Sequence, residues 1–565
     1  MQQSKPLSIT PELKFPKIGL LTAEQWIVGS HVLTGLAALL IGIFLGPFQV
    51  FRRAPALKWA IPVFSYYYQA LTVHGVLNAL FFTTFFIVGF SYFAIMRSLK
   101  REMWSTKLVW VAFWLMFVGL MLVVYALVTN QANVLYTFYP SLIAHPAFYF
   151  GLVLLVVGTW VVTANLFMTY GQWRKENPKE HLPLAVFATL ANFIIWTVSS
   201  LGVAIEVLFM LLPLSLGLIT QTDPQAGRTL FWFFGHPLVY FWLLPAYTSW
   251  YAMLPKQAGS KIFSDPLARV AFILLMIFSI PVGVHHQFTD PGISAVMKGI
   301  QTVFTFVVAI PSLLTAFNVG AMLELSGRRR GAKTLVDWAW KIDWKDPIIA
   351  GQVSAMLLFV LGGITGIMNA SLTLNIALHN TSWIPAHFHQ TLGGAVTLTF
   401  MAVVYWLVPM IRGRKLFSTK LALWQVHTWS IGMMVFGATY GQAGLIGVPR
   451  RTDLGAANAY INVAAVPWLN AAAIGGALLL ISGILFYINV FGTLFVSKAP
   501  LDIEAPIDTY VESKSPLWME KWGIWLSIIA ILCVIAYAPV FLEVFDFTNG
   551  FQTPGYTPNG APYKP

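Results

Sequence analysis

The sequence predicts an all-α integral membrane protein, a single bundle of about thirteen transmembrane helices. Of its 565 residues, 58% are hydrophobic and 10% are charged, whereas a soluble domain carries about 25% charged residues. Apolar runs long enough to cross about 30 Å of hydrocarbon recur along nearly the whole chain, with short polar loops between them. The spans are expected to begin near Trp26, Tyr66, Trp104, Leu142, Pro183, Leu230, Leu267, Gly299, Pro347, Ile384, Leu421, Val463 and Lys521.

The chain is expected to form one domain between two short ends. Residues 1–22 are polar and contain three prolines, which favours a retained cytoplasmic segment over a cleavable signal. Residues 23–545 form the membrane domain, and residues 546–565, rich in Gly, Pro and Asn, are expected to be an external tail. The single cysteine, Cys533, excludes a disulfide framework and a thiolate metal cage. Any metal must therefore bind to histidine.

The net charge of +13 indicates membrane orientation and argues against nucleic-acid binding. Lys and Arg concentrate in the loops after even-numbered spans, as in Arg328 to Arg330, and are sparse after odd-numbered spans. Because cytoplasmic loops carry the excess of positive charge, we expect a cytoplasmic N-terminus and an external C-terminus.

Six histidines are predicted to share one depth near the external face of the membrane. Intramembrane ionisable residues are costly and usually functional, and neutral imidazole is a common metal ligand. A metal site is therefore expected, whereas His31 and His427 have no companions and are expected to be neutral core residues. The six are His74, His236, His285, His286, His387 and His389.

Two of these histidines are separated by one residue, which indicates two metal groups. On a helix, His387 and His389 project about 200° from each other, so one helix could ligate two planar groups, one on each flank. His74 is then available as the sixth ligand of one heme, which suits electron transfer, while the other heme keeps an open axial position.

The remaining three histidines predict a copper site. His236, His285 and His286 form a good nitrogen set for copper with one position left for substrate. An open iron that faces an open copper is a site for a diatomic molecule. Tyr240 lies one turn from His236, where it could donate a proton and an electron.

These motifs resemble the catalytic subunit of the heme-copper oxidases, and most closely their B family, found in thermophilic bacteria and archaea. The resemblance rests on the segments 68–75, 235–240, 284–287 and 385–389. It implies a terminal respiratory oxidase in a prokaryotic plasma membrane, a cytochrome c oxidase that reduces dioxygen to water with four electrons. It also implies proton uptake and proton pumping.

The resemblance also assigns cofactors and partners. It implies low-spin heme b on His74 and His389, a high-spin heme of a- or o-type on His387, and one copper ion, copper B. It further implies that Tyr240 is covalently joined to the copper-ligating His236. A small subunit II with a dicopper center is the expected partner, with cytochrome c as electron donor and quinol as the second candidate. The implied copper ligands are His236, His285 and His286.

Other positions match the family or depart from it. Arg450 and Arg451 are similar to the arginines that hold heme propionates, a role suited to guanidinium geometry, although an interfacial charge cluster is the alternative. The A family has a glutamate where this chain has Leu238, so one proton route is missing. The B family has an aspartate beside a histidine near the propionates. Here the matching residues are Asn375 and His379, which leaves His379 as the expected participant in proton transfer.

A stripe of tyrosines predicts a proton path. From His236, the residues Tyr240, Tyr247 and Tyr251 follow at helical spacing within about 60° of arc, and the stripe descends about 22 Å toward the cytoplasm. The family's single path uses hydroxyls at places matching Ser264, Ser312 and Thr315. Interfacial tyrosines and hydrogen bonds between helices are the alternative. Glu206 is equally compatible with a structural and a proton role.

Three other functions compete with an oxidase. A nitric oxide reductase shares the six histidines but has iron in place of copper and no matching tyrosine, so Tyr240 favours the oxidase. A secondary transporter suits thirteen spans but has no use for the motif of His387 and His389. A passive diheme electron carrier would not explain the other three histidines.

Overall fold

The computed structural model describes residues 17–18, 21–64, 66–501, 507 and 513–544. Within this part of the chain nearly all regular secondary structure is helical, so the predicted all-α fold is confirmed. The only strands among the described residues are β1 (Lys17–Ile18) and β2 (Leu21–Thr22), which pair antiparallel just before the first helix. Most of the predicted N-terminal segment, and all of the predicted tail 546–565, lie outside the described residues.

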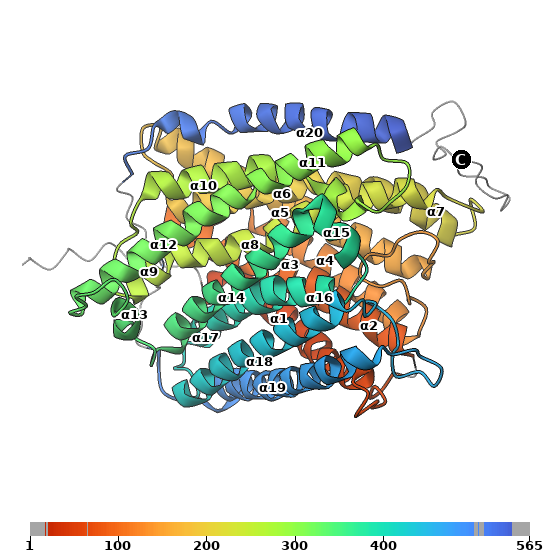
Figure 1. Ribbon diagram of the computed structural model, residues 1–565. Helices are drawn as coiled ribbons and strands as arrows, with labels where there is room; N and C mark the ends of the chain where they lie inside the picture. The colour runs from red at the N-terminus through yellow and green to blue at the C-terminus, as the bar shows by residue number, and fades with distance from the viewer. Residues whose placement is uncertain (1–16, 19–20, 65, 502–506, 508–512, 545–565) are drawn as a thin grey trace, which may run out of the picture.

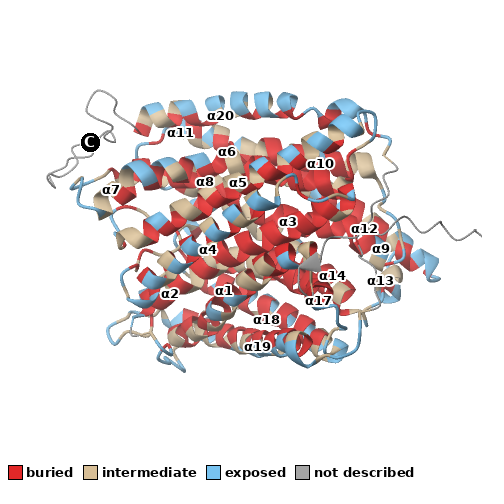
Figure 2. Cartoon of the chain, turned by 180° about the vertical axis from the view of Figure 1, so that it is seen from behind, coloured by how far each residue is buried: buried red, intermediate tan, exposed pale blue. Residues whose placement is uncertain are grey.

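The helices run side by side across the molecule as one bundle (Figure 1). Buried residues fill the middle of the bundle, whereas exposed residues follow its outer helices and both ends (Figure 2). The helices of the first half are α1 (Ala23–Arg53), α2 (Tyr67–Gly75), α3 (Thr83–Leu99), α4 (Thr106–Val128), α5 (Pro146–Glu176), α6 (Leu184–Glu206), α7 (Leu212–Ser215), α8 (Pro224–Ala252), α9 (Leu254–Gln257) and α10 (Asp265–Phe278). The helices of the second half are α11 (Ala295–Val307), α12 (Ala309–Arg329), α13 (Trp338–Lys341), α14 (Pro347–Ala370), α15 (Leu372–Leu378), α16 (Trp383–Phe388), α17 (Leu398–Arg412), α18 (Thr419–Leu445), α19 (Val466–Phe491) and α20 (Trp522–Val544).

Several helices continue into π-helical segments, which are wound more widely than an α-helix, and three short 3-10 helices, which are wound more tightly, also occur in the described chain. The π-helical segments are η1 (Val76–Phe82), η2 (Val207–Leu211), η4 (His389–Thr397) and η6 (Gly492–Val496), and the 3-10 helices are η3 (Gly283–Gln287), η5 (Val463–Ala465) and η7 (Leu517–Glu520). Such π-segments often occur at functional sites. Two of them lie next to candidate metal ligands. Segment η1 begins two residues after His74, and η4 begins with His389 itself.

Eleven continuous helical stretches of the described chain are long and apolar enough to cross a membrane. The sequence predicted about thirteen spans, and the two others, near Leu267 and Leu421, are present as α10 and α18. Helix α10 has only 14 residues because the chain leaves the helix before Pro281, which has no N–H to continue it. Helix α18 is long, but Gln425 and His427 in its first half lower its apolarity.

The end of α10 changes one expectation. The sequence placed His285 and His286 at the far end of a continuous seventh span. In the structure the helix ends at Phe278, and both histidines lie on the separate 3-10 turn η3. The ligands are thus carried by a short turn that the surrounding helices must hold in position.

Candidate metal centre

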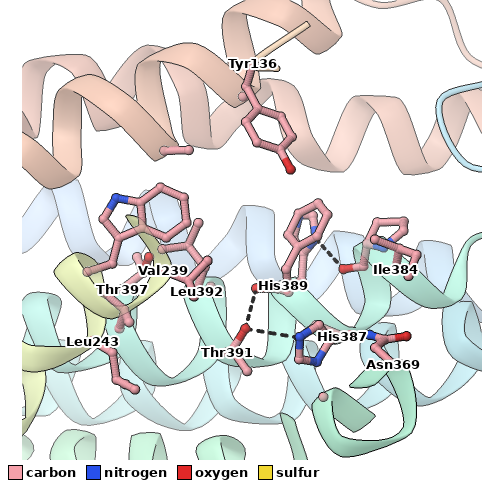
Figure 3. Close-up of a pocket in the computed structure, with 18 of the residues that line it drawn as sticks. Tyr136, Val239, Leu243, Asn369, Ile384, His387, His389, Thr391, Leu392 and Thr397 are labelled. Atoms are coloured by element: carbon pink, nitrogen blue, oxygen red, sulfur yellow. Dashed lines mark hydrogen bonds between the residues drawn. The ribbon is translucent and has the colours of Figure 1, made fainter. Parts of the chain in front are cut away.

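One elongated cavity of about 520 Å³ holds all six predicted ligands. Its walls come from α1, α2, α8, α12, α14, α16, η4 and α18, and most of the lining side chains are apolar. Figure 3 shows His387 and His389 on one wall of this cavity, with Tyr136 on the opposite wall. All six imidazoles therefore face one cavity, while their common depth in the membrane stays a prediction.

His74 and His389 face each other as a parallel pair. Their ring centroids are 6.0 Å apart and their planes differ by 7°. Each ring donates its Nδ1–H to a carbonyl, His74 to Gly42 at 2.8 Å and His389 to Pro385 at 2.7 Å. The lone pair of each ring therefore lies on Nε2. Since an imidazole nitrogen binds a metal at about 2 Å, one iron fits between the two rings.

The side chain of His387, two residues before His389, forms its hydrogen bonds with helix α14. Its Nδ1 lies 3.0 Å from both the Gly362 carbonyl and the Thr365 hydroxyl, and this hydroxyl itself donates to the Gly362 carbonyl. His387 therefore donates from Nδ1 and keeps the Nε2 lone pair free. A Cβ at Gly366 would lie 2.9 Å from the Cε1 of His387, so a glycine is needed where α14 passes the ring.

The three other histidines form a compact cluster. The ligand atoms of His236, His285 and His286 all lie within 4.8 Å of one another. The Nδ1 of His236 is 3.3 Å from the Nε2 of His286, which is close to the separation expected for nitrogens bound at about 2 Å to a single ion. Among the described residues, these three form the group of His, Cys, Asp or Glu side chains that could hold a metal ion.

Neighbouring side chains fix which nitrogen each ring presents. The Nδ1 of His285 is 2.9 Å from Thr305 Oγ1, and Thr305 donates its own proton to the Gln301 carbonyl at 2.6 Å. His285 must therefore donate from Nδ1 and present Nε2. The indole of Trp232 stacks on His286, with 3.7 Å between ring centroids and 12° between planes.

Tyr240 lies beside the cluster, as its helical spacing from His236 predicts. The two ring centroids are 4.9 Å apart, and both residues line the cavity. His236 turns its Nδ1 toward His286. The Nε2 of His236 therefore faces away from His286, and this atom is buried with no hydrogen-bond partner among the described residues.

A cluster of positive charge closes one end of the cavity. Arg450 donates to the Asn380 side-chain oxygen at 2.8 and 3.1 Å, and the guanidinium of Arg451 lies 5.8 Å from the ring centroids of Tyr136 and Tyr139. Burial and then the charge of Arg451 lower the pKa of Arg450 to about 10. Two adjacent cations with only partial exposure favour an anion beside them, so this end of the cavity suits the carboxylates of a heme.

Asn375 and His379 form a contact pair, and both line the cavity. The Nδ1 of His379 lies 3.2 Å from the Asn375 side-chain oxygen, to which it donates. Burial, followed by the charges of Arg450 and Arg228, lowers the pKa of His379 to about 4. His379 is therefore neutral at neutral pH, and the amide of Asn375 supplies no negative charge that would raise the pKa again.

The tyrosine stripe lies on α8, with the predicted hydroxyls of α12 next to it. Tyr247 is beside Ser312, and Tyr251 is beside Thr315 and Asn318. Within the described part of the chain, the hydroxyls of Tyr247 and Tyr251 have no hydrogen bond of standard geometry. Buried hydroxyls of this kind are usually satisfied by ordered water.

Ser264 has a structural role that the sequence did not predict. Its hydroxyl caps α10 by accepting from the N–H of Leu267. The Asn318 side chain bonds to both backbone groups of Ser264, at 2.9 and 2.7 Å. Asn318 thus joins this cap to Tyr251, and its amide gave no signal in the sequence.

Sequence reasoning also missed Arg53 and Trp232. Arg53 ends α1, lines the cavity and donates to the carbonyls of Thr452 and Pro449, to the latter at 2.7 Å. Trp232 lies four residues before His236, so its helical spacing was a usable signal. For His31, the hydrogen bond from Nδ1 to the Ile27 carbonyl, 2.8 Å long, agrees with the predicted core role.

An apolar membrane cavity with a parallel pair of imidazoles, a single imidazole, a cluster of three and a cationic end fits two hemes and a copper ion. This combination defines a membrane oxidoreductase of the heme-copper type. A family model described as Cytochrome C and Quinol oxidase polypeptide I matches residues 26–479. The chain belongs to this family, and the predicted enzyme class is thereby confirmed.

Individual relatives and a solved structure are also similar to this chain. Cytochrome c oxidase subunit 1 of Thermus thermophilus is 40% identical over 536 residues, which cover 92% of this chain and 95% of the relative. The heme-copper oxidase subunit I+III of Aeropyrum pernix is 26% identical over 443 residues, 74% of this chain and 51% of the relative. A cryo-EM structure of a heme-copper terminal oxidase dimer is 41% identical, with 92% of each chain covered and a TM-score of 0.87.

Proposed function

We propose that this chain is the catalytic subunit of a B-family heme-copper oxygen reductase, a terminal respiratory oxidase that reduces dioxygen to water. The observation that carries the proposal is the joint presence, in one cavity, of three imidazoles within 4.8 Å and a parallel pair 6.0 Å apart. The 40% identity to Cytochrome c oxidase subunit 1 of Thermus thermophilus, a thermophilic bacterium, supports the B-family assignment.

The free lone pairs support a specific set of ligands. His74 and His389 would hold low-spin heme b between their Nε2 atoms, and His387 would hold a high-spin heme of a- or o-type. Copper would bind between Nδ1 of one histidine and Nε2 of the two others. When bound, these groups supply electron transfer to a heme-copper pair that binds dioxygen. The three copper ligands would be His236, His285 and His286.

Tyr240 would supply a proton and an electron at the copper side. Its place beside His236, 4.9 Å between ring centroids, supports this role. The nitric oxide reductase alternative has no matching tyrosine, so the same contact favours the oxidase.

Protons would reach Tyr240 from the opposite end of α8. The adjacency of Tyr247 to Ser312 and of Tyr251 to Thr315 supports this path, with water between the hydroxyls. Ser264 would stand near the cytoplasmic entrance of this path, since its hydroxyl accepts from Leu267 N–H and keeps its own proton to donate. We include proton pumping in the proposal because the resemblance to the heme-copper oxidases implies it.

The cationic end would hold the heme propionates. Arg450 and Arg451 would bind these carboxylates, and two adjacent cations in the cavity lining support an anionic occupant. His379, next to Asn375, would exchange protons close to the same carboxylates. Without a carboxylate at position 375, His379 would act as a neutral hydrogen-bond partner at neutral pH.

Electrons would come from cytochrome c through a small subunit II with a dicopper center, with quinol as the second candidate. The chain would span the plasma membrane of a prokaryotic cell, with residues 1–22 in the cytoplasm and residues 546–565 outside. The basic loops after even-numbered spans support this orientation. The membrane domain would then comprise residues 23–545.

A pyridine hemochrome spectrum with metal analysis of the purified protein tests the proposal. Two hemes and one copper per chain are expected, with two heme types. A second non-heme iron without copper would instead identify a nitric oxide reductase. Absence of heme would contradict the proposal altogether and favour a transporter.

A further inference from the structure

The last helix, α20, is peripheral, yet it sends a polar group into the core. Only 28% of its most apolar stretch is buried, the lowest share among the eleven candidate spans, and it lies along the edge of the bundle beside α10 and α11 (Figure 1). Tyr537 of α20 is nevertheless 2% exposed. Its ring packs against Phe233 of α8, with 4.8 Å between centroids.

The Tyr537 hydroxyl bonds to the break that precedes the copper-ligand candidates. It accepts a hydrogen bond from the N–H of Gly283 at 2.8 Å and donates one to the carbonyl of Ile280 at 3.0 Å. These backbone groups have lost their helical partners because α10 ends at Phe278. In a membrane interior, water is not available to replace such partners. One side chain therefore ties together both sides of the break, two residues before His285.

Helix α8 confines the same segment from the other side. A Cβ at Gly283 would lie 2.0 Å from the Trp232 carbonyl oxygen and 2.6 Å from the Tyr537 hydroxyl oxygen. The backbone is thus wedged between α8 and α20, and Trp232 in addition stacks on His286. The position of η3 depends on both helices.

The residue next to Tyr537 reaches the His285 ring by a second route. The Ala536 carbonyl accepts a hydrogen bond from the Gln301 side chain at 3.0 Å. The Gln301 carbonyl accepts from Thr305, whose oxygen accepts from the Nδ1 of His285. Two adjacent residues of α20 therefore contact both the backbone that carries His285 and the helix that orients its imidazole.

We infer that α20 acts as a positioning element for the copper centre, with Tyr537 as the positioning residue that sets η3 and Gln301 as the link to the His285 ring. This inference rests on the proposed copper site. Neither residue contacts the metal. Both act by holding the imidazoles where three nitrogens can meet one ion.

Tyr537→Phe tests the inference because it removes the hydroxyl and keeps the ring. The variant is expected to retain both heme spectra but to hold copper about 10-fold more weakly, as for other outer-shell partners of metal ligands. The measurements are copper per heme after dialysis against a copper(I) chelator, and the infrared band of carbon monoxide bound to copper. The band should shift or broaden, since it reports the arrangement of the three imidazoles.

Tyr487→Phe is the matched control. Its hydroxyl is buried and donates to the Leu36 carbonyl at 2.8 Å, in a regular part of the bundle. Wild-type copper retention and an unshifted band are expected for it. Wild-type behaviour of Tyr537→Phe, or an equal loss in Tyr487→Phe, would overturn the inference.

Gln301→Leu is a second, independent test that still decides the matter if the Tyr537→Phe variant fails to bind heme. It breaks the bond to the Ala536 carbonyl and leaves the break in α10 untouched, so a shifted carbon monoxide band supports the inference and an unshifted band overturns it. A wild-type protein that binds two hemes but no copper would instead refute the proposed function, which separates the two failures.

Discussion

Gly46→Ala on α1 should selectively disturb the heme that we propose lies between His74 and His389. An ideal Cβ at position 46 would lie 2.8 Å from the Cε1 of His74. Carbon atoms in ordinary contact are about 3.5–4.0 Å apart, so the ring would have to retreat by roughly 1 Å. The ring has little freedom to do so, because its Nδ1–H is bonded to the Gly42 carbonyl at 2.8 Å.

The energetic cost follows from this overlap. Overpacking of a filled site costs about 1–3 kcal/mol, which is about 5- to 140-fold in an equilibrium constant. The cost falls on axial ligation and not on the helix itself, since alanine is favoured over glycine in a helix by about 1 kcal/mol. We therefore expect a folded protein in which a large fraction of the low-spin heme has lost His74.

Optical and electron paramagnetic resonance spectra of the purified variant measure this loss directly. The low-spin signal should fall and a second high-spin signal should appear, while copper content stays at the wild-type level. Gly320→Ala on α12 is the control, because no atom lies within 4 Å of its Cβ position. An intact low-spin signal at full heme content, or an equal loss in the control, would refute the reasoning.

Three other substitutions test separate parts of the structure. Tyr251→Phe should slow turnover at saturating electron donor by at least about tenfold with an unchanged heme spectrum, whereas the exposed Tyr460→Phe should not, and unchanged turnover would count against the proton path. Asn375→Asp would place a carboxylate 3.2 Å from His379 and raise its pKa from about 4 by about 1–3 units. His379 would then become positively charged as the pH falls through about 5–7. A pH titration of the high-spin heme spectrum should detect this change, and a profile equal to that of the wild type would contradict the contact between His379 and residue 375. Glu520→Gln removes the buried partner of Arg269 and Arg174 and should cost about 3–5 kcal/mol of stability. Glu176→Gln, whose carboxylate is 63% exposed, should cost at most about 1 kcal/mol, so equal thermal midpoints would be evidence against the buried network.

The fold was predictable because its signals are local. Apolar runs and polar caps recur at the period of a membrane helix, and the structure contains a helix at every predicted span. The end of α10 at Phe278 was less visible, since Ser279 and Ile280 continue the apolar run and only Pro281 marks the stop. The sequence therefore placed the ligand pair on a helix and not on the 3-10 turn η3.

The ligand set was predictable for a different reason. Histidine is rare inside membranes, so six of them at one depth indicated a common purpose even before their distances were known. The contacts that orient the rings were not predictable, because Thr305 and Thr365 come from other helices and nothing in their own segments marks them as functional. Ser264 has a further role that the sequence did not indicate, since its hydroxyl also caps a helix, and its place on the proton path stays a prediction.

The junction of α16 and η4 has a mechanical consequence. His387 and His389, the proposed ligands of both irons, are separated by a single residue of one backbone. Hemes held by these two histidines would be displaced together by thermal motion of this junction, so the gap between them would vary little while the bundle fluctuates. Their spacing would then be set mainly by the covalent geometry of this backbone and less by the looser packing of the surrounding helices.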